Sequence, residues 1–232
     1  MPQLPAAIVF DFDGVIADTE RLHLEAFRRA LSSADHQITR SPNPGLELSD
    51  DDYYARYLGF DDEGVIRLLG ADRGVDLGDA RIRELVEEKG RAYDALVAEA
   101  KSVLYPGAEA CIRRFHGRLP LAIASGAYAD EIRAVLTPAG LLSCFETIVG
   151  CGDTVAGKPS AEPYEEAARR LGVDAHRCVA IEDSRWGIQS AVAAGMTCIA
   201  VTTNYKAHEL PGAVVVVPGL DGVTMELVQS LG

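Results

Sequence analysis

Short apolar runs recur along the chain and predict the strands of a buried sheet. Residues 6–10, AAIVF, contain no polar position, and a continuous run of this length is typical of a strand covered on both faces of a parallel sheet. The second half of the chain contains comparable runs. They predict further strands at 119–124, 147–149, 178–181, 198–201 and 214–217.

Between these runs, apolar residues return every three or four positions, which is the spacing of one helix face. This periodicity predicts helices at 108–115, 129–136, 161–171, 187–194 and 222–231. Strands that alternate with helices through short loops are typical of a doubly wound parallel sheet with right-handed connections. We therefore predict a Rossmann-like α/β core.

The segment between residues 21 and 98 is different, because it has helical spacing but no apolar run of the strand type. We predict helices after Glu20, from Ser49 as N-cap through Leu58, from Asp62 onwards and over 81–100, with a connection at 36–48. An all-helical block after a single strand indicates an inserted domain. The predicted division is an α/β core of residues 1–18 and 102–232 and a helical cap domain of residues 19–101.

The charge of the chain restricts its partners. Its 232 residues carry a formal net charge of −13, and no basic stripe offers a surface to nucleic acid or to an anionic membrane. An anionic substrate would therefore need a local cation. The five cysteines include no C-x-x-C pair, and neither a signal peptide nor a transmembrane run is present, so we expect a reduced, cytoplasmic protein. Monomer and homodimer both remain open.

Polar residues follow the predicted strands at their carboxyl ends. Asp11 and Asp13 come directly after the first strand, and Gly14 lets the chain turn. Taken alone, this pair is also compatible with a solvated turn. Later strands are followed by other polar groups, and the full candidate set is Asp11, Asp13, Ser125, Gly126, Lys158, Glu182 and Asp183. Because open α/β sheets bind ligands at the carboxyl ends of their strands, we expect these residues to converge.

The charge balance of this set predicts its chemistry. Four carboxylates and one lysine leave a strong negative excess, which a divalent cation would compensate, and hard oxygen ligands favour Mg²⁺. The ion and Lys158 would neutralise an approaching phosphoryl group. An aspartate could then act as nucleophile and form an aspartyl-phosphate, while a second acid protonates the leaving oxygen and later activates water.

The motifs D-F-D-G-V-I-A-D-T, the Ser125 strand end, Lys158-Pro159 and I-E-D-S-x-x-G-I together resemble the haloacid dehalogenase superfamily. They look most like its β-phosphoglucomutase and phosphoglycolate-phosphatase branch, which carries a helical cap after the first motif. The resemblance implies Asp11 as the phosphorylated nucleophile and Asp13 as the acid/base. True dehalogenases lack this second aspartate, so Asp13 argues against carbon–halogen chemistry.

The resemblance also implies how the phosphate and the metal are held. Ser125 and Lys158 would bind the transferring phosphoryl group, with the backbone N–H of Gly126. Asp183 would be a metal ligand, and Glu182 a further or indirect one. The implied Mg²⁺ site consists of Asp11, Asp13 through its backbone carbonyl, Glu182 and Asp183.

Four residues of the helical block resemble substrate or hinge positions of the family. D-T-E-R-L-H matches a D-T-x-x-x-H pattern, so His23 either orients Asp13 or is a hinge residue. Gly59 and Phe60 lie where the cap places its specificity loop. E-E-K-G-R-A-Y resembles a cap segment that offers a lysine, here Lys89.

The chain departs from the mutases at two positions. Those enzymes hold a distal phosphate with an arginine in the specificity loop and a lysine soon after the second-motif serine. Here the loop is acidic and Ala127-Tyr128 follow the serine, although Lys89 or Arg67 could substitute. We therefore expect a Mg²⁺-dependent phosphatase for a small phosphorylated metabolite, with a sugar-phosphate mutase or a non-catalytic binding protein as alternatives.

Overall fold

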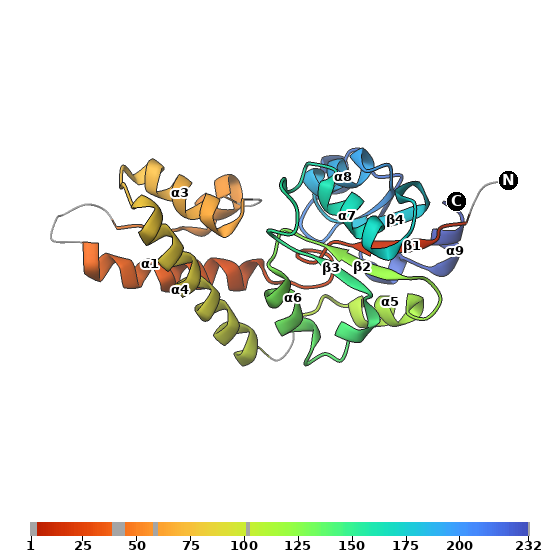
Figure 1. The fold of residues 1–232 in the computed structure, drawn as a ribbon, viewed down its shortest axis with the longest axis horizontal. Helices are drawn as coiled ribbons and strands as arrows, with labels where there is room; N and C mark the ends of the chain where they lie inside the picture. The colour runs from red at the N-terminus through yellow and green to blue at the C-terminus, as the bar shows by residue number, and fades with distance from the viewer. Residues whose placement is uncertain (1–3, 39–44, 58–59, 101–102, 232) are drawn as a thin grey trace. The chain divides into compact units, whose positions relative to one another are not determined.

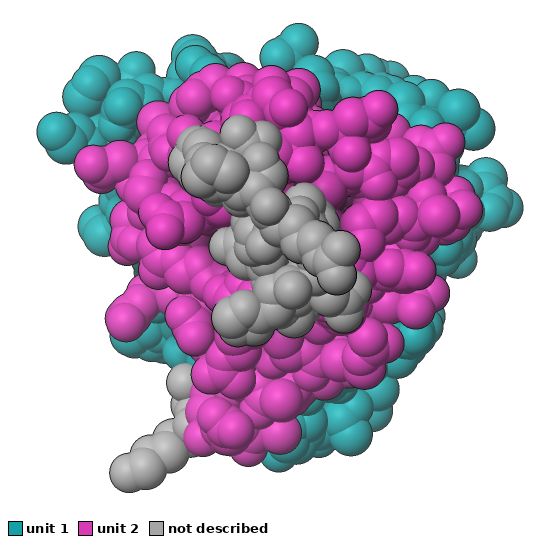
Figure 2. Space-filling model, turned by 90° about the vertical axis from the view of Figure 1, so that its left-hand side faces the viewer, with its two compact units in different colours: residues 1–18, 103–232 teal, residues 19–102 magenta. Residues whose placement is uncertain are grey.

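The architecture is given by a computed structural model that describes residues 4–38, 45–57, 60–100 and 103–231; within residues 33–38 the description covers the backbone alone. The chain divides into two compact units. Unit 1 consists of residues 1–18 and 103–232, and unit 2 consists of residues 19–102 (Figure 2). Each unit has an apolar core of its own.

Unit 1 is built on a parallel sheet of six strands in the order β3-β2-β1-β4-β5-β6. The strands are β1 (Ala7–Phe10), β2 (Leu121–Ala124), β3 (Thr147–Val149), β4 (Cys178–Glu182), β5 (Thr197–Val201) and β6 (Val215–Val217). The order reverses between β1 and β4, which is the switch point where doubly wound sheets bind ligands. The predicted α/β fold is confirmed.

The helices of unit 1 cover both faces of this sheet. Helices α7 (Glu162–Leu171) and α8 (Arg185–Ala193) lie on one face, and α5 (Ala108–Phe115) and α6 (Ala129–Leu136) lie on the other (Figure 1). The last helix, α9 (Met225–Gln229), is shorter than the predicted 222–231. A 3₁₀ turn at Leu220–Gly222 precedes it, and the Thr224 hydroxyl caps its first turn by accepting from Leu227 N.

The two faces of the sheet carry side chains of different size. The face under α7 and α8 is lined mainly by small residues, among them Ala122, Ala124, Ala180 and Ala200. Small side chains let these helices approach the strands closely. Because residues two apart on a strand point the same way, Glu182 shares this face with Ala180.

The two chain segments that connect the units pair with each other within unit 1. Ala17 forms an antiparallel bridge with Leu104, and Asp18 N donates to Val103 O at 2.7 Å. Tyr105 N donates to Ile16 O at 2.9 Å on the other side of this bridge. The segment that leaves unit 1 and the segment that returns to it are therefore hydrogen-bonded neighbours.

The described residues of unit 2 form helices joined by loops, with no strand among them. Its elements are α1 (Glu20–Ile38), α2 (Asp50–Asp52), a π-helical turn (Tyr53–Tyr57), α3 (Asp62–Arg73) and α4 (Gly78–Glu99). The Ser49 side chain caps α2 as predicted, accepting from Asp52 N at 3.1 Å. Two details differ from the sequence expectation: α1 continues to Ile38 instead of ending before His36, and residues 53–57 form a π-helix.

The core of unit 2 joins α1, α3 and α4. Leu24, Phe27 and Leu31 of α1 pack with Ile66 and Leu69 of α3 and with Ile82 and Leu85 of α4. Their spacing along each helix is the three-to-four repeat from which the helices were predicted.

Among the described helices, none has both the length and the apolar character that crossing a membrane requires.

Candidate active site

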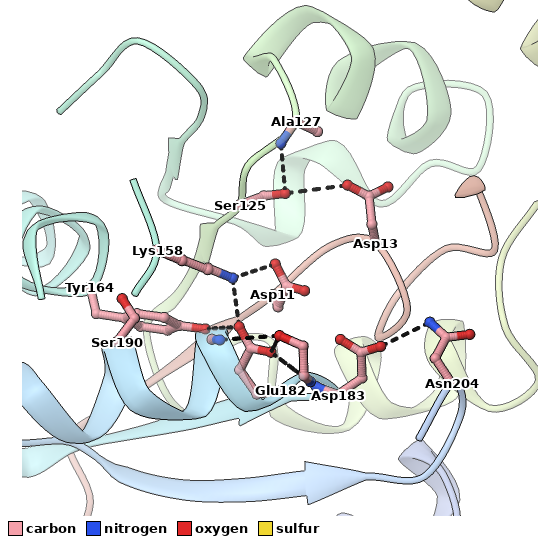
Figure 3. A network of polar contacts seen from close by, with 12 residues as sticks. Asp11, Asp13, Ser125, Ala127, Lys158, Tyr164, Glu182, Asp183, Ser190 and Asn204 are labelled. Atoms are coloured by element: carbon pink, nitrogen blue, oxygen red, sulfur yellow. Dashed lines mark hydrogen bonds and ion pairs between the residues drawn. The ribbon is translucent and has the colours of Figure 1, made fainter. Parts of the chain in front are cut away.

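The carboxyl edge of the sheet brings the first and last acidic motifs together at the switch point. Phe10 of β1 is in register with Ile181 of β4, and Asp11 N donates to Ile181 O at 2.9 Å. Asp11 and Glu182 therefore sit side by side, and Asp183 follows directly (Figure 3). All three acids are buried. The pairing of β1 with β4 therefore explains why Asp11 and Glu182, far apart in the sequence, share one site.

Lys158 supplies the positive charge of the site. It lies in the loop between β3 and α7, and its ammonium is 2.6 Å from Asp11 Oδ1 and 2.6 Å from Glu182 Oε1. The side chain is only 14% exposed. This geometry is that of a charge-assisted hydrogen bond to each of two carboxylates.

Both oxygens of Glu182 are already engaged. Oε1 accepts from Lys158 Nζ and from the Tyr164 hydroxyl, the latter at 2.8 Å. Oε2 accepts from Asp183 N at 3.0 Å and from Ser184 N and Ser184 Oγ, each at 3.2 Å. An ionised carboxylate has roughly four lone-pair sites, so Glu182 is saturated by protein donors.

Gly14 makes room for the acidic motif. Gly14, with φ of 81°, lies in the left-handed region, and a Cβ there would overlap the Asp183 carboxylate. Asp183 Oδ2 also accepts from the Asn204 amide at 2.8 Å. Position 14 must therefore be glycine, both for the backbone turn and for the space that Asp183 occupies.

Asp13 has a different partner from Asp11. The strand ends at Phe10, and the Phe12 carbonyl then accepts from Ile16 N at 2.8 Å in a tight turn. The chain therefore bends at Phe12, between the two acids. Ser125 Oγ, at the end of β2, is 3.5 Å from Asp13 Oδ2 (Figure 3).

The second motif is held by its own backbone. Ser125 Oγ accepts from Ala127 N at 3.1 Å, and this bond fixes the hydroxyl at the carboxyl end of β2. Gly126, between them, is exposed. Ser125 itself is only 5% exposed.

Burial and crowding perturb the titration of these groups. Burial, followed by Glu182, raises the pKa of Asp11 to about 8, and Lys158 opposes this rise. The pKa of Asp183 is raised well above its ordinary value, mainly by burial and then by Glu182. Burial alone would lower the pKa of Lys158, but Asp11 and Glu182 outweigh it and raise that pKa.

The donor set fits a hard divalent cation. Oxygens of Asp11, Glu182 and Asp183 lie within 4.8 Å of one another. Carboxylate oxygens are the ligands that Mg²⁺ prefers, and three buried carboxylates exceed the single ammonium beside them. A cation bound there would favour the ionised forms of Asp11 and Asp183 and so oppose the upward shifts of their pKa values.

Two residues contact the acids of the site although the sequence analysis did not predict them there: Tyr164 and Asn204. Tyr164 lies within the predicted helix 161–171, but its hydroxyl contact with Glu182 depends on how α7 packs. Asn204 follows the carboxyl end of β5, and the edge argument that found the other candidates could have found it too.

The predicted cap residues are described within unit 2 alone. Lys89 is fully buried, and its ammonium is 2.8 Å from Asp62 Oδ2 and 5.1 Å from the centroid of the Tyr93 ring. The His23 ring stacks on Tyr93 at 4.3 Å, and burial, followed by Lys89, lowers its pKa. Phe60 is 54% exposed. Gly59 lies outside the described residues.

Arg67, the other possible substitute for the mutase arginine, is already paired. Its Nη2 lies 2.7 Å from both Glu63 Oε1 and Asp79 Oδ1.

Comparison with known proteins agrees with the geometry. Residues 5–195 match the family of haloacid dehalogenase-like hydrolases. The protein CbbY of Cupriavidus necator is 33% identical over 227 residues, which cover 92% of this chain and 85% of the relative. Fructose-1-phosphate phosphatase YqaB of Escherichia coli is 29% identical over 204 residues, covering 84% of this chain and 96% of the relative.

A solved structure leads to the same family. The crystal structure of CbbY from Rhodobacter sphaeroides in complex with phosphate aligns with a TM-score of 0.86 at 25% identity, and the alignment covers 98% of this chain and 100% of that one. The resemblance inferred from the four motifs is confirmed. The chain belongs to the haloacid dehalogenase-like hydrolases.

Proposed function

We propose that the protein is a Mg²⁺-dependent phosphatase that hydrolyses a small phosphomonoester, a sugar phosphate or a similar metabolite, through an aspartyl-phosphate. The observation that carries the proposal is the position of Asp11. Its carboxylate lies 2.6 Å from the Lys158 ammonium, within a group of acids whose oxygens lie within 4.8 Å of one another. A carboxylate suited to nucleophilic attack, a cation and a group of acids suited to a metal ion are thereby adjacent.

The metal would be held by the carboxylates of Asp11 and Asp183 and by the backbone carbonyl of Asp13. Glu182, whose oxygens already accept from protein donors, would act indirectly by holding Lys158. When bound, Mg²⁺ supplies charge neutralisation for the acids and for a phosphate oxygen. The protein supplies the remaining positive charge through Lys158. In an acidic chain of net charge −13, such local compensation is what allows an anionic substrate to approach.

In the first step, an oxygen of Asp11 attacks phosphorus in line, and the bond from phosphorus to the substrate oxygen breaks. Asp13, as general acid, gives its proton to that leaving oxygen. Lys158 and Ser125, with the backbone N–H of Gly126, hold the oxygens of the transferring group. These preformed donors stabilise the charge spread over the phosphoryl oxygens.

In the second step, water attacks the phosphorus of the aspartyl-phosphate. Asp13, now ionised, takes a proton from that water, and the bond between phosphorus and Asp11 breaks. Inorganic phosphate leaves and the Asp11 carboxylate is restored. The two steps share one acid/base, which is why a single carboxylate beside Ser125 is sufficient.

The relatives support this class of substrate. YqaB is named as a phosphatase of fructose 1-phosphate, and the solved CbbY structure contains phosphate. A mutase is disfavoured because Arg67 is engaged by two carboxylates and no lysine follows Ser125 in Ala127-Tyr128. Efficient formation of glucose 6-phosphate from β-glucose 1-phosphate with glucose 1,6-bisphosphate would contradict the phosphatase proposal.

The decisive test is hydrolysis of a generic aryl phosphate by wild type and by Asp11→Asn, with and without Mg²⁺. We expect turnover that requires Mg²⁺ and falls by orders of magnitude in the variant. Equal rates for the two proteins would contradict the nucleophile assignment. Absence of turnover by wild type on a panel of phosphorylated sugars, nucleotides and short acids would favour a binding protein.

A further inference from the structure

Tyr164 contacts both Glu182 and Lys158, which form an ion pair at the centre of the site. It is fully buried on α7, and its hydroxyl donates to Glu182 Oε1 at 2.8 Å (Figure 3). The Lys158 ammonium lies 5.1 Å from the centroid of its ring. A cation within about 6 Å of a ring centroid is attracted by the ring face. One side chain thus holds the carboxylate through its hydroxyl and the ammonium through its ring.

The surroundings explain how a tyrosine reaches this point. The sheet face under α7 carries small side chains, and Tyr164 packs in the same cluster as Ala122, Ala124 and Ala180. Glu182 points to this face by the alternation of β4. The ring therefore fills the space above small residues, and its hydroxyl meets the acid at the end of the strand.

Packing alone would be satisfied by phenylalanine. A buried hydroxyl is costly unless it finds a partner, and at Tyr164 the partner is the oxygen that also binds Lys158. Because the hydroxyl and the ammonium share Glu182 Oε1, loss of the hydroxyl leaves that oxygen with Lys158 as its donor and loosens its position. Lys158, which lies 2.6 Å from that oxygen and 2.6 Å from Asp11 Oδ1, would then be held less firmly in its position beside Asp11.

We infer that Tyr164 is a positioning residue for phosphate binding, which fixes Glu182 and supports Lys158 so that the ammonium stays where the phosphoryl group arrives. The inference rests on the proposed function, since it assigns Lys158 to the phosphate. It adds a residue whose effect is transmitted through the ion pair. A purely structural tyrosine would influence stability without changing phosphate affinity.

The test is equilibrium binding of inorganic phosphate at saturating Mg²⁺, measured by calorimetry on Tyr164→Phe and Tyr164→Met. The first removes the hydroxyl and keeps the ring; the second removes both and fills the space with a flexible side chain. We expect Tyr164→Phe to weaken phosphate binding by about tenfold, as for loss of a hydrogen bond to a charged group, and Tyr164→Met to weaken it further. The Kd for Mg²⁺ alone is expected to change by less than about threefold, because Asp11 and Asp183 are untouched.

Tyr57→Phe is the matched control. Tyr57 is also buried, and its hydroxyl donates to a carboxylate, Asp72, at 2.6 Å, but it lies in the core of unit 2. We expect it to lower the melting temperature as Tyr164→Phe does while phosphate affinity stays at the wild-type value. If Tyr164→Phe also binds phosphate as tightly as wild type, the inference is overturned. If Tyr164→Phe does not fold, the Met variant tests the loss of hydroxyl and ring together against the same control, and wild-type phosphate affinity in that variant overturns the inference.

A double-mutant cycle tests the route of the effect. If Tyr164 acts through Glu182, then Tyr164→Phe should cause less than about twofold further loss of phosphate affinity in a Glu182→Gln background. Independent, multiplicative losses would overturn the inference while leaving the phosphatase proposal intact. Failure of wild type both to bind phosphate and to hydrolyse any phosphomonoester would instead overturn the proposed function, and this inference with it.

Discussion

Gly187 lies against the carboxylate of Glu182 so closely that a Cβ on the glycine would overlap the acid. Gly187 is in the first turn of α8, where alanine would normally be the better helix former by about 1 kcal/mol. The space taken by Glu182 therefore decides the residue type against local propensity. This relationship explains the glycine of the I-E-D-S-x-x-G-I motif in physical terms.

We expect Gly187→Ala to displace Glu182 and to release Lys158, which Glu182 holds. Phosphomonoesterase activity and phosphate binding should both fall by at least about tenfold, since a charge-assisted contact is lost. Gly90→Ala is the control, because Gly90 is also helical but nothing lies within 4 Å of its added Cβ. It should retain full activity and gain a little thermal stability. Equal activity of the two variants would refute the steric explanation.

Asn204 is expected to hold Asp183 ready for the metal. Partners that orient metal ligands typically contribute about 10–100-fold to metal affinity, so Asn204→Ala should weaken Mg²⁺ binding by about tenfold. Trp186, the single tryptophan, is three positions after Asp183, and its fluorescence can follow the titration. Tyr105→Phe is the control, because its hydroxyl is 3.5 Å from Asn204 and contributes little. Wild-type Mg²⁺ affinity in Asn204→Ala would contradict the assignment.

Stability should depend on pH in a way that Mg²⁺ removes. The raised pKa values of Asp11 and Asp183 mean that the folded, metal-free protein binds more protons than the unfolded chain. Their contribution therefore lowers the free energy of unfolding as pH rises from about 4 towards about 8. Mg²⁺ binds the ionised acids, so its effect on the melting temperature should be larger at about pH 8 than at about pH 5.5. Asp183→Asn should reduce the difference between the Mg²⁺ effects on the melting temperature at the two pH values. An identical Mg²⁺ effect at both pH values in the wild type would contradict this prediction.

The Lys89–Asp62 pair in unit 2 gives a prediction about stability. Lys89→Met leaves the Asp62 carboxylate, which is 12% exposed, without its cation. Removing one partner of a buried pair typically costs about 3–5 kcal/mol, and the double variant Lys89→Met/Asp62→Leu should recover most of it. Urea unfolding followed by circular dichroism measures both.

The control for this pair is on the same helix. Arg91 and Glu87 are 4.0 Å apart and largely exposed, so Arg91→Met should change the free energy of unfolding by less than about 0.5 kcal/mol. A Lys89→Met variant as stable as Arg91→Met would show that the buried pair is energetically unimportant.

The sheet and its edge were predictable because their signals are local. Apolar runs gave the strands, and the rule that parallel strands end at one edge was enough to expect Asp11, Lys158, Glu182 and Asp183 together. The bend at Phe12, which sets where Asp13 lies, was not predictable in the same way. It depends on where β1 ends and on the turn closed by the Phe12 carbonyl, which one residue of strand length would change.

Contacts that form only on packing could not be read from spacing. The periodicity of α4 does place Lys89 in line with Ile82, Leu85 and Tyr93, on the buried face. Its partner Asp62 belongs to another helix, and nothing local identifies it. Tyr164 is also a residue whose partner could not be predicted. The apolar spacing of α7 marks it as a core position, but its hydroxyl contact with Glu182 forms only when α7 packs on the sheet.

The pairing of Ala17 with Leu104 has a consequence for engineering the chain. Since Asp18 and Val103 are already joined by a hydrogen bond of 2.7 Å, a two-residue turn between them could replace residues 19–102 with little loop-closure entropy. The six-stranded unit would then be expressed as a continuous minimal protein. Such a truncation would retain Asp11, Asp13, Ser125, Lys158, Glu182 and Asp183 on their original scaffold.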